Sequence, residues 1–250
     1  MENKRRIVLV GATSAIAAYC ARLWSQRTPI DLTLVARDAS RVQRVADDLR
    51  VRSPQSNIRT VLADFLDPRA IQATVDAIFE AGPADIVLIA HGALPSQAEC
   101  QQNLQICADA LSVNAMSPVL YAEAFARHMA AANRGTLALI GSVAGDRGRK
   151  SNYVYGAAKG LVDRYAQGLQ HRFAGTGVKV VLIKPGPTDT PMTAHLKAQG
   201  AKLASPEQVA AAIVAAVEQG QTTVYAPAKW RLIMLIIRHL PNFIFNKLNI

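Results

Sequence analysis

The amino-acid sequence predicts a single α/β domain: a doubly wound parallel sheet of about seven strands with helices on both faces. Short runs rich in valine, isoleucine and leucine alternate with longer alanine-rich segments of helical pattern. The short runs are almost continuously apolar, as in parallel strands buried on both faces. A chain of 250 residues is long enough to bury one large core of this kind.

Seven runs are expected to form strands, and because a helical segment separates each run from the next, consecutive strands should be parallel. These runs are Arg6–Val10, Asp31–Ala36, Ile58–Ala63, Asp85–Ala90, Thr136–Gly141, Val178–Lys184 and Thr223–Ala226. The sequence contains no internal repeat or linker. We therefore expect one main domain over residues 1–228 and a C-terminal amphipathic helical tail over residues 229–250.

The boundaries of one helix are predicted in detail. Ser205 is a typical N-cap, Pro206 suits the first helical position and Gln208 completes a capping box. Gly220 suits the position just past the end of the helix. The preceding stretch, Thr188–Ala204, is polar and predicts an irregular loop after a strand end, where open α/β sheets bind ligands.

Composition and charge limit the classes of partner. The formal net charge of +10 suggests an acidic partner such as nucleic acid, anionic lipid or a phosphorylated substrate. Lysine and arginine are scattered and are not interleaved with aromatic residues, so no nucleic-acid partner is expected. Cys20, Cys100 and Cys107 lack metal-ligand spacing, which predicts free thiols in a reducing compartment and no metal site.

The N-terminus has a basic start and an apolar stretch, as a signal peptide does. Gly11, Thr13 and Ser14 interrupt this stretch where a strand should turn into a helix, so export is not expected. No apolar run approaches the ~18–20 residues of a membrane-spanning helix. These patterns predict a cytoplasmic protein.

A nucleotide site is predicted where the first strand turns into a helix, in "IVLVGATSAIA". A tight turn at Gly11 would direct backbone N–H groups of the helix N-terminus toward a pyrophosphate, as in Rossmann-type folds. The motif keeps one glycine of the usual three, because Ala15 and Ala17 stand at the later positions. An ordinary glycine turn therefore remains the alternative. The candidate cofactor contacts in this segment are Gly11, Thr13, Ser14 and Ile16.

The ends of the next strands predict which nucleotide binds. Where an acidic residue would take the ribose hydroxyls of NAD, the chain has Ala36 followed by Arg37, and a guanidinium suits a 2′-phosphate. The expected cofactor is therefore NADPH/NADP⁺. Asp64 is expected to meet the adenine amine, and Ala90 and Gly92 are expected to let the backbone pass close to the nicotinamide ribose.

The catalytic group is predicted in "GSVAGDRGRKSNYVYGAAKG". Ser142 ends the fifth expected strand, and Tyr155 and Lys159 are spaced to share one face of a helix. Tyr153 competes for the same role, but the residue four positions beyond it is Ala157. The arrangement of serine, tyrosine and lysine is typical of carbonyl reduction.

Reduction of a ketone needs a proton at oxygen as hydride reaches carbon. A free tyrosine, with a pKa of ~10, is a weak acid for this purpose. Lys159 and the positive charge of the nicotinamide are expected to lower the pKa of Tyr155, and Ser142 is expected to hydrogen-bond the substrate oxygen. Lys159 is also expected to hold the nicotinamide ribose.

Taken together, these motifs resemble the short-chain dehydrogenase/reductase family over about Ile7 to Ala226. The resemblance implies an NADP(H)-dependent oxidoreductase acting on CH–OH groups, with Asn114 in "LSVNAMSP" as the fourth member of the catalytic set. It also implies that Pro185 and Gly186 form a turn at the cofactor and that Thr188 holds the carboxamide. The chain departs from the family in its glycine motif and in "AHG", where the family often has Asn-Ala-Gly.

Two further segments suggest a substrate. Arg147 and Arg149 lie between the catalytic serine and tyrosine, and arginines at a substrate mouth suit an anionic group such as phosphate; a solvated turn is the alternative. The tail carries Arg231 and Arg238 on a narrow face opposite a broad apolar face that contains Trp230. Further members of the predicted apolar face are Ile233, Ile237 and Ile244, and Pro241 is expected to break the helix.

A broad apolar face with basic edges suits a helix lying on an anionic membrane surface. The alternative is a tail packed on the protein's own core or on a neighbouring subunit. The phrases "GATSAIA", "IAHG", "SVAGDRGRKSNYVYGAAK" and "WRLIMLIIR" are similar to those of the decaprenylphosphoryl-2-keto-ribose reductases. This resemblance implies reduction of a 2-keto group that a flavin oxidase forms on a polyprenyl-phosphate pentose, so that ribose becomes arabinose.

From this resemblance we expect a homo-oligomer, dimer or tetramer, in the cytoplasm and peripheral on the inner face of the cell membrane. Two other functions stay open. One is an NADPH ketoreductase of another substrate, such as a 3-oxoacyl thioester or a small carbonyl. The other is a non-catalytic NADP(H)-binding membrane adaptor.

Overall fold

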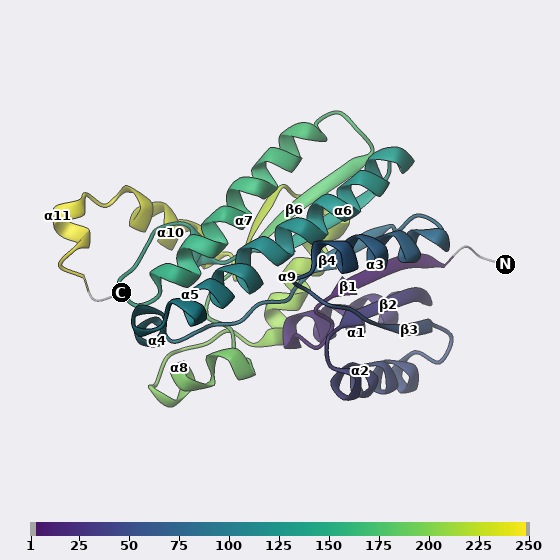
Figure 1. Cartoon of the computed structure of the whole chain (residues 1–250), viewed down its shortest axis with the longest axis horizontal. Coiled ribbons are helices and arrows are strands. Elements are labelled where there is room, and N and C mark those ends of the chain that lie inside the picture. The colour runs from purple at the N-terminus through teal and green to yellow at the C-terminus, as the bar shows by residue number, and fades with distance from the viewer. Residues whose placement is uncertain (1–3, 249–250) are drawn as a thin grey trace.

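The computed structural model describes residues 4–248. Its centre is a sheet of seven parallel strands in the order β3-β2-β1-β4-β5-β6-β7 (Figure 1). This confirms the predicted fold class, and each strand lies within one residue of its predicted bounds. The strands are β1 (Arg5–Val10), β2 (Ile30–Ala36), β3 (Asn57–Leu62), β4 (Ile86–Ile89), β5 (Gly135–Ile140), β6 (Val178–Pro185) and β7 (Thr223–Ala226).

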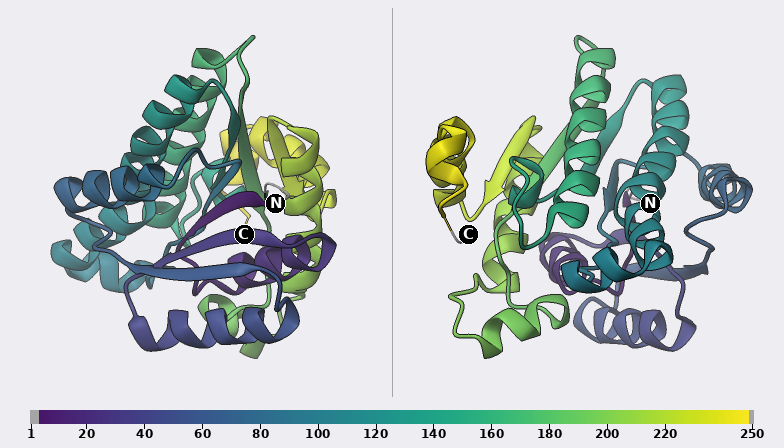
Figure 2. Two further views of the ribbon diagram at one scale, coloured as in Figure 1. Left: turned by 90° about the vertical axis from the view of Figure 1, so that its right-hand side faces the viewer. Right: turned by 60° about the vertical axis from the view of Figure 1, so that its left-hand side comes forward.

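Helices cover both faces of the sheet (Figures 1 and 2). Helices α1, α2 and α9 pack on one face, and α3, α6 and α7 pack on the other. The helices are α1 (Ala15–Arg27), α2 (Ala39–Arg52), α3 (Pro68–Glu80), α4 (Gln97–Gln102), α5 (Leu104–Leu111), α6 (Ser117–Ala132), α7 (Tyr153–Arg172), α8 (Ala194–Ala198), α9 (Pro206–Gln219), α10 (Lys229–His239) and α11 (Asn242–Phe245).

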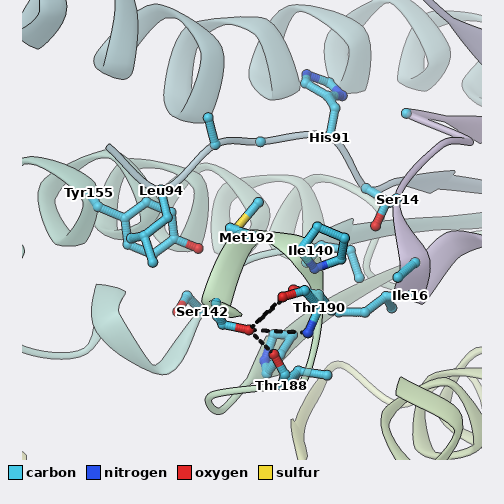
Figure 3. Close-up of a pocket in the computed structure, with 18 of the residues that line it drawn as sticks. Ser14, Ile16, His91, Leu94, Ile140, Ser142, Tyr155, Thr188, Thr190 and Met192 are labelled. Atoms are coloured by element: carbon cyan, nitrogen blue, oxygen red, sulfur yellow. Dashed lines mark hydrogen bonds between the residues drawn. The ribbon is translucent and has the colours of Figure 1, made fainter. Parts of the chain in front are cut away.

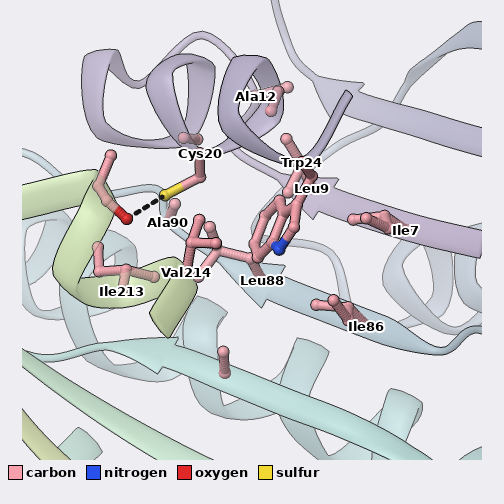
Figure 4. Packing of buried hydrophobic residues seen from close by; sticks show 14 of the residues in the cluster. Ile7, Leu9, Ala12, Cys20, Trp24, Ile86, Leu88, Ala90, Ile213 and Val214 are labelled. Carbon is pink, nitrogen blue, oxygen red and sulfur yellow. Dashed lines mark hydrogen bonds between the residues drawn. The ribbon is translucent and has the colours of Figure 1, made fainter. Parts of the chain in front are cut away.

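The packing of α1 against α9 keeps the first turn of α1 in a fixed position over the sheet. Trp24 of α1 is buried among Leu9, Leu88 and Val214 (Figure 4). Its indole Nε1 donates a hydrogen bond of 3.1 Å to Glu218 of α9. At the edge of the sheet, β3 alternates between exposed and half-buried residues, because it has a neighbouring strand on one side. Continuous burial of this strand was therefore a wrong expectation.

Helix α9 begins and ends at the predicted residues, but among the described residues the Gln208 side chain does not return the second hydrogen bond of the predicted capping box. The hydroxyl of Ser205 accepts a hydrogen bond of 3.2 Å from the backbone N–H of Gln208, and Gly220 has a left-handed φ of 62°. The stretch Thr188–Ala204 is not wholly irregular, contrary to the prediction. It contains a 3₁₀ turn, Pro191–Thr193, followed by α8, because Thr190 and Thr193 form a reciprocal capping box.

The tail forms two helices, and Pro241 separates α10 from α11 as predicted. Helix α10 lies beside β7 and packs on the domain (Figure 2). Met234 is fully buried, and Trp230 lies so close to Gly186 that a Cβ there would be 1.9 Å from the indole nitrogen.

The predicted outward face of the tail is therefore wrong for α10, because Trp230, Ile233 and Ile237 are half-buried on its inner side. A second apolar stripe faces outward in their place. It consists of Leu232, Leu235 and Ile236 of α10 with Phe243 and Ile244 of α11. Within residues 4–248, no helix is long and apolar enough to cross a membrane.

Candidate active site

A cavity of about 940 Å³ opens at the carboxyl ends of the strands, where the sequence predicted the ligand site. Loops after β1, β2, β4, β5 and β6 line it, together with the start of α7 and the segment before α8 (Figure 3). Of the predicted site residues, the structure brings together Gly11, Thr13, Ser14, Ile16, Arg37, Ala90, Gly92, Ser142, Arg149, Tyr155, Lys159, Pro185, Gly186 and Thr188 in its lining.

The turn after β1 requires glycine at position 11. Gly11 has a φ of 81°, and a Cβ on it would lie 2.6 Å from the backbone nitrogen of His91. The chain then enters α1 with Ser14 at the N-cap position, so the N-terminus of the helix faces the cavity. Backbone N–H groups at a helix N-terminus favour anions, which suits a pyrophosphate.

The two alanines of the glycine motif are accommodated in different ways. Ala15 lines the cavity, whereas Ala17 is fully buried in the core cluster between α1 and the sheet. The methyl group of Ala17 therefore takes part in helix–sheet packing and does not face the ligand.

Two arginines face the cavity beyond β2. The guanidinium of Arg37 lies 5.7 Å from the ring of Phe65, and Arg41 in the first turn of α2 lines the same wall. Arg41 and Phe65 were not predicted from the sequence. The signal for Arg41 is its place in the first turn of α2, which begins two residues after Arg37. Asp38 also lines the wall, and its carboxylate caps α2 by accepting from the Arg41 N–H at 2.9 Å.

Asp64 is not among the residues that line the cavity, so its expected contact with the adenine stays a prediction. Its carboxylate accepts hydrogen bonds from the backbone N–H groups of Leu66 at 2.7 Å and Asp67 at 3.2 Å. These bonds lower the pKa of Asp64. The aspartate thus closes the turn that leads into α3, and its neighbour Phe65 reaches the cavity instead.

The segment after β4 is held by two buried side chains. His91 contacts Ser117 through Nε2 at 2.8 Å, and burial lowers its pKa to about 3, so the ring is neutral. Asn114 lies in a π-helical turn between α5 and α6, and its Oδ1 accepts from the Ala93 N–H at 2.9 Å. A Cβ on Gly92 would be 2.9 Å from that same oxygen, so glycine allows the close passage.

Ser142, Tyr155 and Lys159 line the same cavity. Figure 3 shows the first two of them in its wall. Lys159 donates a hydrogen bond of 2.9 Å to the Ile140 carbonyl, and its Nζ lies 5.8 Å from the centre of the Tyr155 ring. Tyr153 is outside the lining, and its hydroxyl contacts Gln101 at the surface. The geometry therefore distinguishes the two tyrosines in the way the lysine spacing suggested.

Burial has a larger effect on these groups than their mutual charge does. It raises the pKa of Tyr155 to about 12, while a hydrogen bond with Ser142 opposes the shift. It lowers the pKa of Lys159 to about 8, and the charge of Asp163 opposes that change. In the protein without cofactor, burial therefore determines the direction of the shift, and the lowering of the Tyr155 pKa by Lys159 together with the nicotinamide stays a prediction. The phenol holds its proton throughout the neutral range.

Arg147 and Arg149 point in different directions. Arg147 is outside the cavity lining, since its guanidinium donates to the carbonyls of Ile237 and Leu240, each at 2.6 Å, at the end of α10. Arg149 lines the cavity and makes only long contacts, at 3.5 Å to the Val143 carbonyl and 3.6 Å to sulfur. Its buried Nε has no hydrogen-bond partner among the described residues.

The chain is similar to one protein family and to two proteins of named organisms. A model of the family described as short chain dehydrogenase matches residues 5–201. An uncharacterised oxidoreductase of Streptomyces coelicolor is 32% identical over 244 residues, covering 98% of this chain and 96% of that protein. An uncharacterised oxidoreductase of Mycobacterium tuberculosis is 30% identical, covering 97% of this chain and 96% of its own length.

Solved structures show the same fold. The short-chain dehydrogenase from Sphingobium yanoikuyae in complex with NADPH has a TM-score of 0.81 at 23% identity, covering 95% of this chain and 97% of that chain. The actinorhodin polyketide ketoreductase with NADPH has a TM-score of 0.78 at 21% identity, covering 90% and 97%. With the family model and the two curated relatives, these likenesses lead to one conclusion: this chain is an oxidoreductase and belongs to the short-chain dehydrogenase/reductase family.

Proposed function

We propose that the protein is an NADPH-dependent reductase that converts a ketone to a secondary alcohol. The observation that carries the proposal is the position of Ser142, Tyr155 and Lys159 on a cavity that Gly11 and Arg37 also line. A cavity of about 940 Å³ has room for a dinucleotide and a substrate. The NADPH complexes of two structural neighbours support the choice of cofactor.

Distinct parts of the wall suit the parts of NADPH. The turn at Gly11 and the N-terminus of α1 suit the pyrophosphate, and Arg37 with Arg41 suits the 2′-phosphate. The turn Pro185–Gly186 and Thr188 suit the nicotinamide end, where the Thr188 hydroxyl donates to the Gly186 carbonyl at 2.9 Å.

The chemistry assigned to the side chains follows from their positions. Bound NADPH would supply a hydride for the carbonyl carbon of the substrate. Tyr155 donates its phenolic proton to the carbonyl oxygen, and the Ser142 hydroxyl holds that oxygen. The ammonium of Lys159 stabilises the phenolate that remains until solvent returns the proton. Asn114 supports the group by holding the backbone at Ala93.

For the substrate we favour the 2-keto group of a polyprenyl-phosphate-linked pentose, which a flavin oxidase would supply. Arg149 offers the cavity a positive charge and an Nε donor that has no hydrogen-bond partner in the described part of the chain. Asn152 also lines the cavity, and its buried Oδ1 lacks a hydrogen-bond partner within residues 4–248. A cationic donor and a free acceptor suit a phosphate and a sugar hydroxyl.

A ketone of another class is the second candidate. Leu94, Val143, Met192 and Leu196 give the cavity an apolar wall beside the catalytic group. Such a wall suits a 3-oxoacyl thioester or a small carbonyl compound without a phosphate. Proton donation by Tyr155 would be the same for both classes of ketone. Discrimination between a phosphorylated and an unphosphorylated substrate therefore depends on Arg149.

The outward stripe of the tail supports attachment to a membrane surface. Leu232, Leu235 and Ile236 are each more than half exposed, and so is Phe243. Exposed Lys229, Arg231, Arg238 and Lys247 flank the stripe, and no acidic residue follows Glu218 in the chain. Apolar residues with basic edges suit an anionic bilayer. We therefore propose a cytoplasmic oxidoreductase peripheral on the membrane, with a subunit contact of a homo-oligomer as the alternative use of this face.

The first prediction concerns the cofactor. We expect NADPH to bind at least ~10-fold tighter than NADH, or ~1.4 kcal/mol, because Arg37 and Arg41 can both reach a 2′-phosphate. Arg37→Asp should erase or reverse this preference, and Arg41→Met should reduce it. Fluorescence titration with both nucleotides measures the dissociation constants. Equal constants for the unsubstituted protein would refute the assignment of NADPH.

The second prediction separates the two tyrosines. Tyr155→Phe should abolish ketone reduction and leave NADPH binding and the thermal midpoint nearly unchanged, since it removes one hydroxyl. Tyr153→Phe is the matched control and should keep most of the turnover, because Tyr153 lies outside the cavity. Equal losses of turnover in both variants would contradict the choice of acid, and full activity of Tyr155→Phe would indicate a different mechanism.

The third prediction tests the substrate. NADPH oxidation is measured with a polyprenyl-phosphate 2-keto-pentose and with a neutral soluble ketone. Arg149→Met keeps the apolar stem but removes the charge, and it should lower kcat/KM for the phosphorylated substrate by more than ~10-fold, equivalent to ~1.4 kcal/mol. The neutral ketone should lose less than ~3-fold. A uniform loss on both substrates would assign Arg149 a structural role.

The fourth prediction tests the outward stripe. Leu235→Gln combined with Ile236→Gln should weaken binding to anionic phospholipid vesicles by at least ~10-fold, because apolar burial contributes roughly 1.5–3 kcal/mol for a fully buried side chain. The packing of the inner face of α10 on the domain and the thermal midpoint of the protein should be unchanged. Leu104→Gln with Val51→Gln, which changes two exposed apolar side chains elsewhere, is the control. Unchanged vesicle binding together with a smaller molecular mass by light scattering would instead identify a subunit contact.

A further inference from the structure

A cluster of buried charges lies behind the catalytic residues. The Lys184 ammonium pairs with Asp163 Oδ2 at 2.7 Å and also contacts Asp146. Tyr225 donates a hydrogen bond of 3.0 Å to the second oxygen of Asp146. The side chains of Lys184, Asp146 and Asp163 are at most 6% exposed. Burial of three charges costs several kcal/mol per ion, and packing alone does not require it.

The members of the cluster come from the four segments that surround the site. Asp146 lies in the loop after Ser142, and Asp163 lies on α7 one turn beyond Lys159. Lys184 directly precedes the Pro185–Gly186 turn of β6, and Tyr225 belongs to β7, which leads into α10. The ion pairs therefore join the elements whose relative positions determine the catalytic geometry.

The carboxylate of Asp163 also lies against the backbone on both sides of Ser142. A Cβ on Gly141 would be 2.8 Å from Asp163 Oδ1, and a Cβ on Gly145 would be 2.9 Å from Oδ2. Glycine at both positions therefore leaves room for the carboxylate. Through these contacts Asp163 meets the serine segment directly while it is carried by the helix of Tyr155 and Lys159.

The charge of Asp163 adds to its role in positioning the Ser142 segment. Oδ1 of Asp163 is buried without a hydrogen-bond partner among the described residues, and burial raises the pKa of this carboxyl to about 6, against the pull of Lys184 and Lys159. The other titratable groups around Asp163 and Lys159 are Tyr155 on α7, Asp146 and Arg149 on the serine loop, Tyr225 on β7 and neutral His91 after β4.

We propose that Asp163, held by Lys184, is a positioning residue that keeps the Ser142 segment in place beside Tyr155 and, one helical turn from Lys159, stabilises the ammonium of that lysine. The inference rests on the catalytic roles proposed above for these three residues. It does not depend on the identity of the ketone. Asp163 touches neither the cavity nor the substrate and acts through its neighbours.

The test measures the titration of Lys159 directly in cofactor-free protein. Protein labelled with ¹³C-lysine gives the Cε shift of Lys159 as a function of pH, and Lys159→Met assigns the signal. Lys159 should titrate near pH 8 in the unsubstituted protein. Asp163→Asn keeps the shape and removes the charge, so Lys159 should lose its proton at least about one pH unit lower. The same titration in both proteins would overturn the proposal.

Turnover of a neutral ketone gives a second measurement. Asp163→Asn should lower kcat at pH 7.5 by ~10-fold or more and move the alkaline limb of its pH profile downward, with KM changed by less than ~3-fold. Lack of turnover by the unsubstituted enzyme would count against the proposed function alone, because the NMR titration needs no substrate.

Asp146→Asn is the matched control, since it weakens the same cluster but leaves the charge of Asp163 beside Lys159. It should lower the thermal midpoint without moving the titration of Lys159. An equal shift of the Lys159 titration in Asp163→Asn and Asp146→Asn would overturn the specific role of Asp163. Asp163→Ala, which needs less space, is the second variant; if both Asp163 variants fail to fold while Asp146→Asn folds, Asp163 serves the fold and the proposal is wrong.

Discussion

The loop between Ser142 and Tyr155 is the constraint on which the rest of the site depends. Asp146 ties it to Lys184 at the end of β6, and Arg147 ties it to the last carbonyls of α10. The loop carries a hydroxyl that must lie within hydrogen-bond reach of a substrate oxygen. A shift of about 1 Å there would remove much of the catalytic effect, because positioning accounts for a large part of enzymatic rates.

This constraint connects the C-terminal tail to the segments that form the active site, although no tail residue lines the cavity among the described residues. Helix α10 meets the serine loop through Arg147 and meets the Pro185–Gly186 turn through Trp230. The Arg147 guanidinium also lies 3.8 Å from the centre of the Phe245 ring, so one side chain joins the loop, α10 and α11. The two ideas about the tail, a membrane-binding surface and a helix packed on the core, are therefore compatible. They concern opposite sides of one helix.

Burial determines the electrostatics of the site. Lys159, Asp163 and Lys184 are almost entirely removed from solvent. Desolvation lowers the pKa of Lys159 and raises that of Asp163, whereas the carboxylates of Asp163 and Asp146 raise the pKa of Lys184 against desolvation. Charged forms persist because opposite charges lie within a few ångströms of one another. Arg149 differs from these groups because it is half-buried and faces the cavity. Its contacts with the rest of the protein are long. Because of this difference, Arg149 suits the binding of a ligand anion, whereas the charges of Lys159, Asp163 and Lys184 suit contacts within the protein.

The sequence by itself determined the fold class, the strand bounds and the set of Ser142, Tyr155 and Lys159, because these depend on local periodicity and on spacing within one helix. It also identified Gly11 and the start of α9, where a single residue meets a local backbone requirement. Tertiary structure decided the rest. The direction of Arg147, the exclusion of Asp64 from the cavity, the exposed side of α10 and the dominance of burial over charge at Tyr155 all depend on groups far apart in the chain. No local pattern records which distant carbonyl or carboxylate a side chain will meet when the sheet brings these segments together.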